Sequence, residues 1–176
     1  TDDTAEYNTA YGLTALDAIT TGDDNSALGY GALGANTTGE ANVAVGRSAL
    51  TANTTGGENV ALGDEALAAN TTGSKNVAIG NRALYANTTA QNNIAIGKQA
   101  ASANTTGTRN LTIGTYAYDA SDTENDNIAI GYQSMTADTA GGEYNTAIGN
   151  YALKSLTSGD GNVAVGYNTL YANTTG

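Results

Sequence analysis

A repeat of 17 residues runs through the whole chain and constrains its fold more than any other feature. Each unit begins with an Asn that is followed four residues later by a Gly, and every step between units is 17 residues except one of 18. The units start at Asn8, Asn25, Asn42, Asn59, Asn76, Asn93, Asn110, Asn127, Asn145 and Asn162. A fixed period of this kind predicts a stack of equal structural units. Because both ends fall within a unit, we expect residues 1–176 to be one repetitive segment of a longer fibre chain.

Each unit reads as one coil of a solenoid. In the unit NVAVGRSALTANTTGGE from Asn42, aliphatic residues at the second and fourth positions flank a small one, and this period of two predicts a strand. The Gly at the fifth position then supplies a bend, the ANTTG run supplies a turn, and the pair Ala49-Leu50 is expected on a second short strand. A helix is disfavoured by the many Asn and Gly residues. We therefore predict an all-β parallel β-solenoid, or β-roll, of about ten coils stacked ~4.8 Å apart.

The alternation along the strand predicts two faces with different roles. We expect the aliphatic second and fourth positions to fill the interior together with the Leu of the second strand. The third position, on the opposite face, is Ala in nine of ten units, and Ala packs poorly on an open sheet surface. This Ala stripe therefore predicts a close contact between chains, in our preferred form a cyclic homotrimer, although Ala on a monomeric solenoid is the alternative. The stripe comprises Ala44, Ala61, Ala78, Ala95, Ala129 and Ala164.

The Asn and Gly columns are interpreted as architecture. Stacked side-chain amides can bond to the amides above and below them or to the backbone of the turns. The clearest members of the columns are Asn42, Gly46, Asn59, Gly63, Asn76, Gly80, Asn93 and Gly97.

Composition argues against catalysis and against several classes of partner. The chain has no Cys and no His, so it offers no thiolate, no imidazole base and no zinc ligands of the usual kind, and we predict no enzyme, cofactor or metal site. With 17 acidic and 6 basic residues the net charge is -11, which disfavours nucleic acid, and no apolar run suggests insertion into a membrane. Acidic residues before the Asn column could hold calcium, but Lys75 and Arg109 in matching turns favour ion pairs of mixed sign.

The run N-[VI]-A-[VIL]-G-x-x-A resembles the head repeats of trimeric autotransporter adhesins and, equally, the shaft repeats of phage tail fibres. The resemblance covers nearly the whole chain, and the inserted ANTTG run, as from Asn53 to Gly56, is more similar to the phage type. It implies a left-handed β-roll, three chains per fibre, and attachment to a cell surface or matrix.

The repeat and the resemblance together predict a structural rod, located outside a bacterium or on a virion, that presents an adhesive or receptor-binding tip to a host cell or matrix. One alternative is direct glycan or matrix binding through tyrosines directly after the strand-ending Gly, namely Tyr30, Tyr132 and Tyr167. Others are polymerisation end to end through unpaired strand edges and, more remotely, ice binding by the paired threonines. The Asn-x-Thr sequences in the same turns are also glycosylation motifs.

Overall fold

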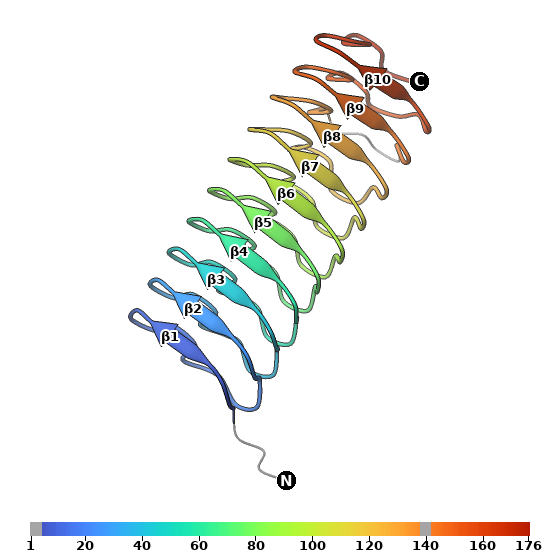
Figure 1. Ribbon diagram of the computed structural model, residues 1–176. Helices are drawn as coiled ribbons and strands as arrows, with labels where there is room; N and C mark the ends of the chain where they lie inside the picture. Colours follow the sequence, from blue (N-terminus) through green and yellow to red (C-terminus); the bar gives the residue numbers. More distant parts are fainter. Residues whose placement is uncertain (1–4, 138–141) are drawn as a thin grey trace.

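The computed structural model describes residues 5–137 and 142–176, and within them the chain winds as a parallel β-solenoid. Coils stack along one axis into a rod, with all strands on one side (Figure 1). Ten three-residue strands form one sheet in sequence order. They are β1 (Thr9–Tyr11), β2 (Ser26–Leu28), β3 (Val43–Val45), β4 (Val60–Leu62), β5 (Val77–Ile79), β6 (Ile94–Ile96), β7 (Leu111–Ile113), β8 (Ile128–Ile130), β9 (Thr146–Ile148) and β10 (Val163–Val165). The predicted fold class is confirmed.

The register of the sheet follows the sequence repeat. Val43 pairs with Val60 and Ala44 with Ala61, and every other pair of neighbouring strands aligns equivalent positions in the same way. The 18-residue step lies between β8 and β9, where Ile128 pairs with Thr146, so the extra residue is absorbed outside the sheet. One coil per repeat unit is thus the correct reading of the periodicity.

The second strand that we predicted for the Ala-Leu pair is not formed. Ala49 and Leu50 lie in a turn, and Leu50 has a φ of 51°, as do its equivalents to within a few degrees. This left-handed conformation folds the chain back sharply, so the interior of the coil is narrow. The pair still links successive coils, because the Leu50 N–H donates to the Ala66 carbonyl at 3.0 Å.

The glycine that ends each strand is needed for two reasons. Gly63 has a φ of 140°, and a Cβ there would lie 2.6 Å from the carbonyl carbon and oxygen of Gly80 in the next coil. The bend therefore requires both an unusual backbone conformation and the absence of a side chain. This confirms the predicted role of the Gly column.

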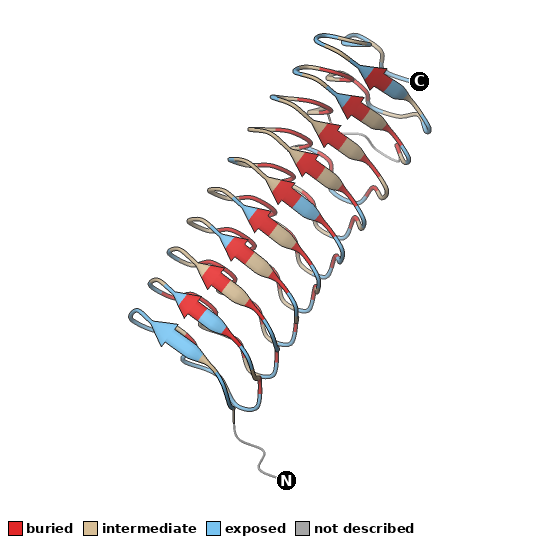
Figure 2. Ribbon diagram, in the orientation of Figure 1, coloured by how far each residue is buried: buried red, intermediate tan, exposed pale blue. Residues whose placement is uncertain are grey.

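The interior is filled by small aliphatic residues and by two Asn columns. Figure 2 shows the middle of each strand from β2 onward as buried, with the flanking positions at least partly open to solvent. Each regular coil contributes the Ala of the strand, the Ala-Leu pair and two buried Asn, as in Ala61, Ala66, Leu67, Asn59 and Asn70. The core is thus a thin column in which each regular layer holds one large aliphatic side chain.

Candidate functional site

The Ala stripe lies inside the chain, so its predicted role as a contact between chains is wrong. Its six members are at most 1% exposed within a single chain, and they belong to the hydrophobic core. They are Ala44, Ala61, Ala78, Ala95, Ala129 and Ala164. The physical reason is that the coil is narrow. Beside the buried Leu, its interior has room for the methyl group of one Ala from the strand but not for the branched side chains at the second and fourth positions. Those positions therefore face outward, opposite to the prediction.

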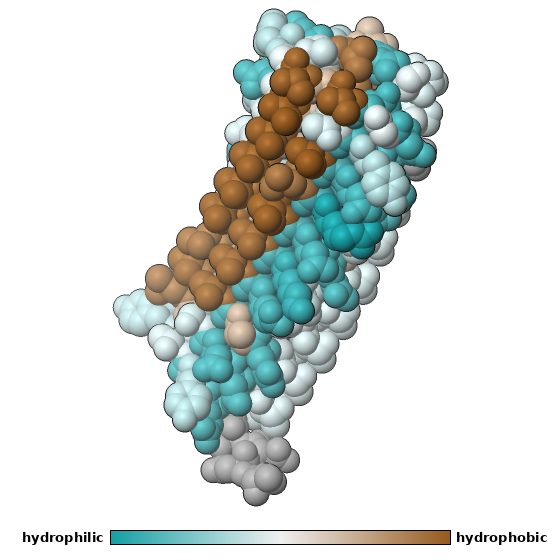
Figure 3. Space-filling model, turned by 45° about the vertical axis from the view of Figure 1, so that its right-hand side comes forward, coloured by the Kyte–Doolittle hydropathy of each residue, from teal (hydrophilic) through white to brown (hydrophobic). Residues whose placement is uncertain are grey.

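The outward face of the sheet carries two files of aliphatic side chains along the rod. Figure 3 shows them as a continuous hydrophobic stripe bordered by hydrophilic surface. Leu62 is 39% exposed, Ile79 37% and Ile94 40%, and the remaining members are half-buried or exposed. The stripe, called here the aliphatic face, consists of Leu28, Val43, Val45, Val60, Leu62, Val77, Ile79, Ile94, Ile96, Leu111, Ile113, Ile128, Ile130, Ile148, Val163 and Val165.

Ion pairs between successive coils lie along both borders of the aliphatic face. On the border after the strands, Arg47 contacts Asp64 and Glu65, each at 3.0 Å. On the border before them, Arg109 donates to both carboxylate oxygens of Asp126 at 2.7 Å, and these bonds hold the pKa of Asp126 below its usual value.

The mixed-sign pairing predicted for Lys75 and Arg109 is confirmed. Lys75 lies 3.8 Å from Glu58, and Arg109 pairs with Asp126 as described above. Among the described residues, no group of three or more acidic, His or Cys side chains is placed to hold a metal ion.

The Asn column forms a hydrogen-bonded ladder, as predicted. Asn59 Nδ2 donates to Asn42 Oδ1 at 3.1 Å and to the Gly73 carbonyl at 2.9 Å, while Asn59 Oδ1 accepts from the backbone N–H of Asn76 at 3.0 Å. Each amide thus closes its own coil and joins it to both neighbours. Buried polar groups are stable only when they are bonded in this way.

A second buried Asn ladder was missed, because the ANTTG run was interpreted only as turn chemistry and as a glycosylation motif. Asn53 Nδ2 donates to Asn36 Oδ1 at 2.8 Å, and Asn70 Nδ2 donates to Asn53 Oδ1 at the same distance. The same 17-residue period would have revealed it. These side chains are fully buried, so in the folded chain they are closed to glycan attachment.

The paired threonines point in two directions. Thr54 Oγ1 donates to the Thr71 carbonyl of the next coil at 3.0 Å, whereas the adjacent Thr55 is exposed. Each regular coil therefore adds one exposed Thr to a single file, and adjacent positions do not form the double row that a flat ice-binding surface uses.

The three tyrosines predicted as ligand contacts do not lie together. Tyr30 is 57% exposed on the second coil, far along the rod from the other two. Tyr132 and Tyr167 both contact Tyr151, with ring centroids 5.4 and 6.1 Å apart and the rings edge to face. The sequence reasoning missed Tyr151, although its position two residues after a strand-ending Gly was a usable signal.

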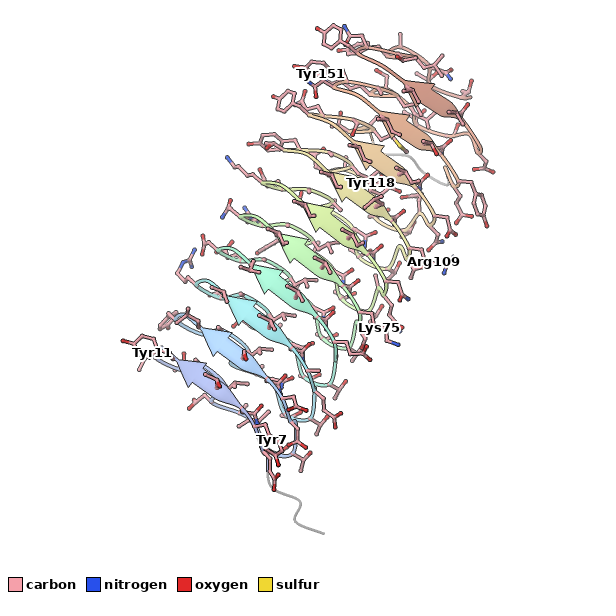
Figure 4. The ribbon with its side chains drawn as sticks, viewed as in Figure 1. Tyr7, Tyr11, Lys75, Arg109, Tyr118 and Tyr151 are labelled. Carbon is pink, nitrogen blue, oxygen red and sulfur yellow. The ribbon has the colours of Figure 1, made fainter. Side chains whose placement is uncertain are left out.

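An open hollow of about 310 Å³ lies beside these rings. Its lining consists of Gln133, Tyr151, Lys154, Tyr167, Asn168 and Tyr171. Lys154 donates to Gln133 Oε1 at 3.0 Å, and its ammonium lies 4.9 Å from the centre of the Tyr151 ring and 5.6 Å from that of Tyr171. Figure 4 shows Tyr151 projecting from the turn that follows its strand. We call this feature the tyrosine hollow.

No protein-family model matches the chain, and neither curated proteins nor solved structures give a significant match. Within the described residues, the structure contains no helix of the length and apolarity required to cross a bilayer. The resemblance to adhesin and phage-fibre repeats therefore stays a prediction.

Proposed function

We propose that this chain is a rod segment of a homotrimeric fibre that holds an adhesive or receptor-binding tip away from the surface that bears it, outside a bacterium or on a virion. The observation that carries the proposal is the aliphatic face. A chain with a net charge of -11 exposes two unbroken files of Val, Ile and Leu along the rod from β3 to β8. Exposed apolar surface of this extent marks an interaction site.

The aliphatic face supplies part of the surface that association needs. Eight steps from β2 to β10 at ~4.8 Å, and three residues per strand at ~3.3 Å, give roughly 38 by 10 Å, or about 380 Å² of footprint per chain. Three such faces total about 1,140 Å², or about 380 Å² for each of three pairwise contacts, which is less than the ~1,000 Å² of a specific two-chain interface, so the trimer must also bury surface beside the aliphatic face. At ~25 cal/mol per Å² the gross gain is about 10 kcal/mol per chain, before the cost of association.

The shape of the aliphatic face suits chains arranged around an axis. It is straight, only two side chains wide, and runs from β2 to β10 with charged residues on both borders. Identical chains side by side with parallel axes can turn these narrow faces inward and leave the ion pairs in water. The three-fold number and the left-handed winding are implied by the resemblance to fibre repeats. In this proposal the aliphatic face, rather than the Ala stripe, forms the contact between chains.

A mechanical role follows from the way the coils are joined. Backbone bonds, two Asn ladders and ion pairs all connect neighbouring coils, so stiffness is distributed along the rod and length grows by whole units. Deletion of residues 59–92, which are two units, should shorten the particle by ~10 Å in small-angle scattering without changing its cross-section.

The mass of the folded protein tests the assembly. Sedimentation at micromolar concentration should give three times 17.6 kDa. Substitution of Leu62→Lys together with Ile96→Lys charges the aliphatic face and should yield folded monomers. The matched control, Thr55→Lys with Thr89→Lys, adds the same charge at the same 34-residue spacing on exposed positions elsewhere and should leave the trimer intact.

A parent protein that sediments as a monomer would refute the proposal, and a stable dimer would refute its three-fold symmetry. Particles that grow steadily with concentration would instead support polymerisation end to end.

A further inference from the structure

We propose that the tyrosine hollow binds an acidic saccharide, with the carboxylate of the sugar on the Lys154 ammonium and its ring against the surrounding tyrosines. This inference concerns the side of the rod and is independent of the proposed spacer role. It rests on the arrangement of the tyrosine rings, on the contacts of Lys154 and on the residues that line the hollow.

The rings form an ordered strip, built by an alternation in the sequence. In four successive coils the tyrosine follows the strand-ending Gly by two, one, two and one residues, at Tyr116, Tyr132, Tyr151 and Tyr167. Neighbouring rings are therefore offset and meet edge to face, with centroids 6.5, 5.4 and 6.1 Å apart. Rings that support one another in this way are held in place, with neighbouring planes at 75–87° to one another, so a sugar would pack against one ring of the strip.

Lys154 differs from the cations paired along the borders of the rod. Arg47, Lys75, Arg82 and Arg109 each lie within 4.0 Å of a carboxylate of a neighbouring coil. Across residues 5–137 and 142–176, no ion pair is formed by Lys154, which contacts Gln133 and two tyrosine rings instead. The carboxylate of Asp119 interacts with this ammonium only beyond ion-pair distance, so the ammonium can still attract an anion into the hollow.

The other residues of the lining suit an acidic sugar better than a small anion that has neither hydroxyl groups nor an apolar face. The side-chain amides of Gln133 and Asn168 can both donate and accept, as hydroxyl groups require, and the tyrosine rings offer apolar surface for the C–H face of a pyranose. The volume of about 310 Å³ is at the lower end of the usual range for small-molecule sites, and it suits one or two sugar rings.

The charge of the whole protein limits the class of ligand further. With -11 overall, the chain repels extended polyanions such as nucleic acid, whereas a saccharide with one carboxylate meets mainly the local ammonium. The ligand class is therefore an oligosaccharide with a single acidic residue, such as a sialylated glycan. None of the residues that line the hollow belongs to the aliphatic face, so assembly and binding use different residues.

The test compares 3′-sialyllactose with lactose, which lacks only the acidic sugar. Titration of the full chain, followed by saturation-transfer NMR and by shifts of amide signals, should show sialyllactose binding with a Kd of ~1 mM and lactose binding at least about tenfold more weakly. Lys154→Gln keeps a polar side chain of similar length without the charge, and it should weaken sialyllactose about tenfold while leaving lactose unchanged. Tyr171→Ala removes a ring and should weaken both sugars.

Lys75→Gln is the matched control, because it removes one lysine charge from the opposite border of the rod and should leave binding unchanged. The proposal is overturned if sialyllactose fails to bind at ~20 mM, if lactose binds equally well, or if Lys75→Gln weakens binding as much as Lys154→Gln. The sedimentation experiment above is read separately, so failure of the sugar site and failure of the trimer are distinguishable.

Discussion

The first Asn ladder offers the sharpest test of what stabilises the rod, and Asn59→Ala in the middle of it is the perturbation. The substitution deprives the buried backbone N–H of Asn76 of its acceptor, which costs ~1–3 kcal/mol. It also removes the two bonds that Asn59 Nδ2 donates to Asn42 Oδ1 and the Gly73 carbonyl, and the bond that Asn76 Nδ2 donates to Asn59 Oδ1, worth ~0.5–1.5 kcal/mol each. The Gly73 carbonyl keeps a second donor in Asn70 Nδ2, so it adds no further penalty. The expected loss is about 2.5–7.5 kcal/mol.

Asn59→Asp tests the acceptor oxygen and the donor nitrogen of the Asn59 amide separately. The carboxylate can still accept from Asn76, but its second oxygen then faces the Asn42 Oδ1 and Gly73 carbonyl acceptors that Nδ2 had satisfied. Burial of the charge raises the folded-state pKa of the new carboxyl above its unfolded value. The charge part of the penalty is therefore full at neutral pH and disappears as the pH falls below ~4, where both states become protonated, whereas the loss of one donated hydrogen bond remains. Asn59→Ala has no such dependence on pH.

The assay is chemical unfolding followed by circular dichroism, at one protein concentration because the proposed assembly would contribute to stability. Hydrogen exchange by mass spectrometry then locates the effect, since each coil contacts only its neighbours and protection should fall around β4 and β5 before β2. The control, Asn92→Gly, removes an exposed amide from a position with a φ of 59° that glycine adopts freely, and should cost less than ~1 kcal/mol. A loss for Asn59→Ala no larger than that of the control would refute the reasoning.

Three further substitutions test other parts of the coil. Gly63→Ala places a methyl group 2.6 Å from the Gly80 carbonyl at a φ of 140°, so we expect a loss of at least ~3 kcal/mol or misfolding in thermal unfolding. Thr112→Ala removes the exception in the Ala file, whose buried hydroxyl has no hydrogen-bond partner among the described residues, and should raise stability by ~1 kcal/mol in urea unfolding. Asp119→Asn should stabilise at pH 7, because burial raises the pKa of Asp119, and the gain should vanish below the unfolded-state pKa when melting curves are compared across pH.

Much of the coil could be predicted from the sequence because the residues that indicate a strand, a bend or an Asn ladder recur at the same positions of successive units. The strand at Val43–Val45, the bend at Gly46 and the ladder at Asn42 each followed from residue chemistry that recurs with one period. Alternation along a strand, however, defines two faces and does not say which one is inside. The interior was assigned to the larger residues, and the left-handed turn at Leu50, which narrows the coil, has no signal in a leucine side chain.

Only part of the tyrosine hollow could be predicted from the sequence, for a related reason. Tyr132 and Tyr167 share a position in the repeat, so both are predicted as ligand contacts. Tyr151 is shifted by one residue in the repeat, and Lys154 lies three residues after Tyr151. Their proximity depends on how the turn after Gly149 folds back over the next coil. Repeat position alone therefore predicts which residues stack in files, and the turn geometry decides which neighbouring files meet.

The placement of Ala inside and of branched residues outside has a physical consequence for assembly. A conventional core would bury the Val, Ile and Leu of the strands and leave the rod with a polar exterior. Here the two Asn ladders and the Ala-Leu column close the coil without those side chains, because hydrogen bonds between coils satisfy the buried amides at little cost in volume. The aliphatic side chains are then left on the outer face of the sheet, where fuller burial would need a partner molecule. In the proposed assembly, folding of the coil and association of the rods draw on different residues, so charge placed at Leu62 and Ile96 should separate the chains while the ladders keep each coil intact.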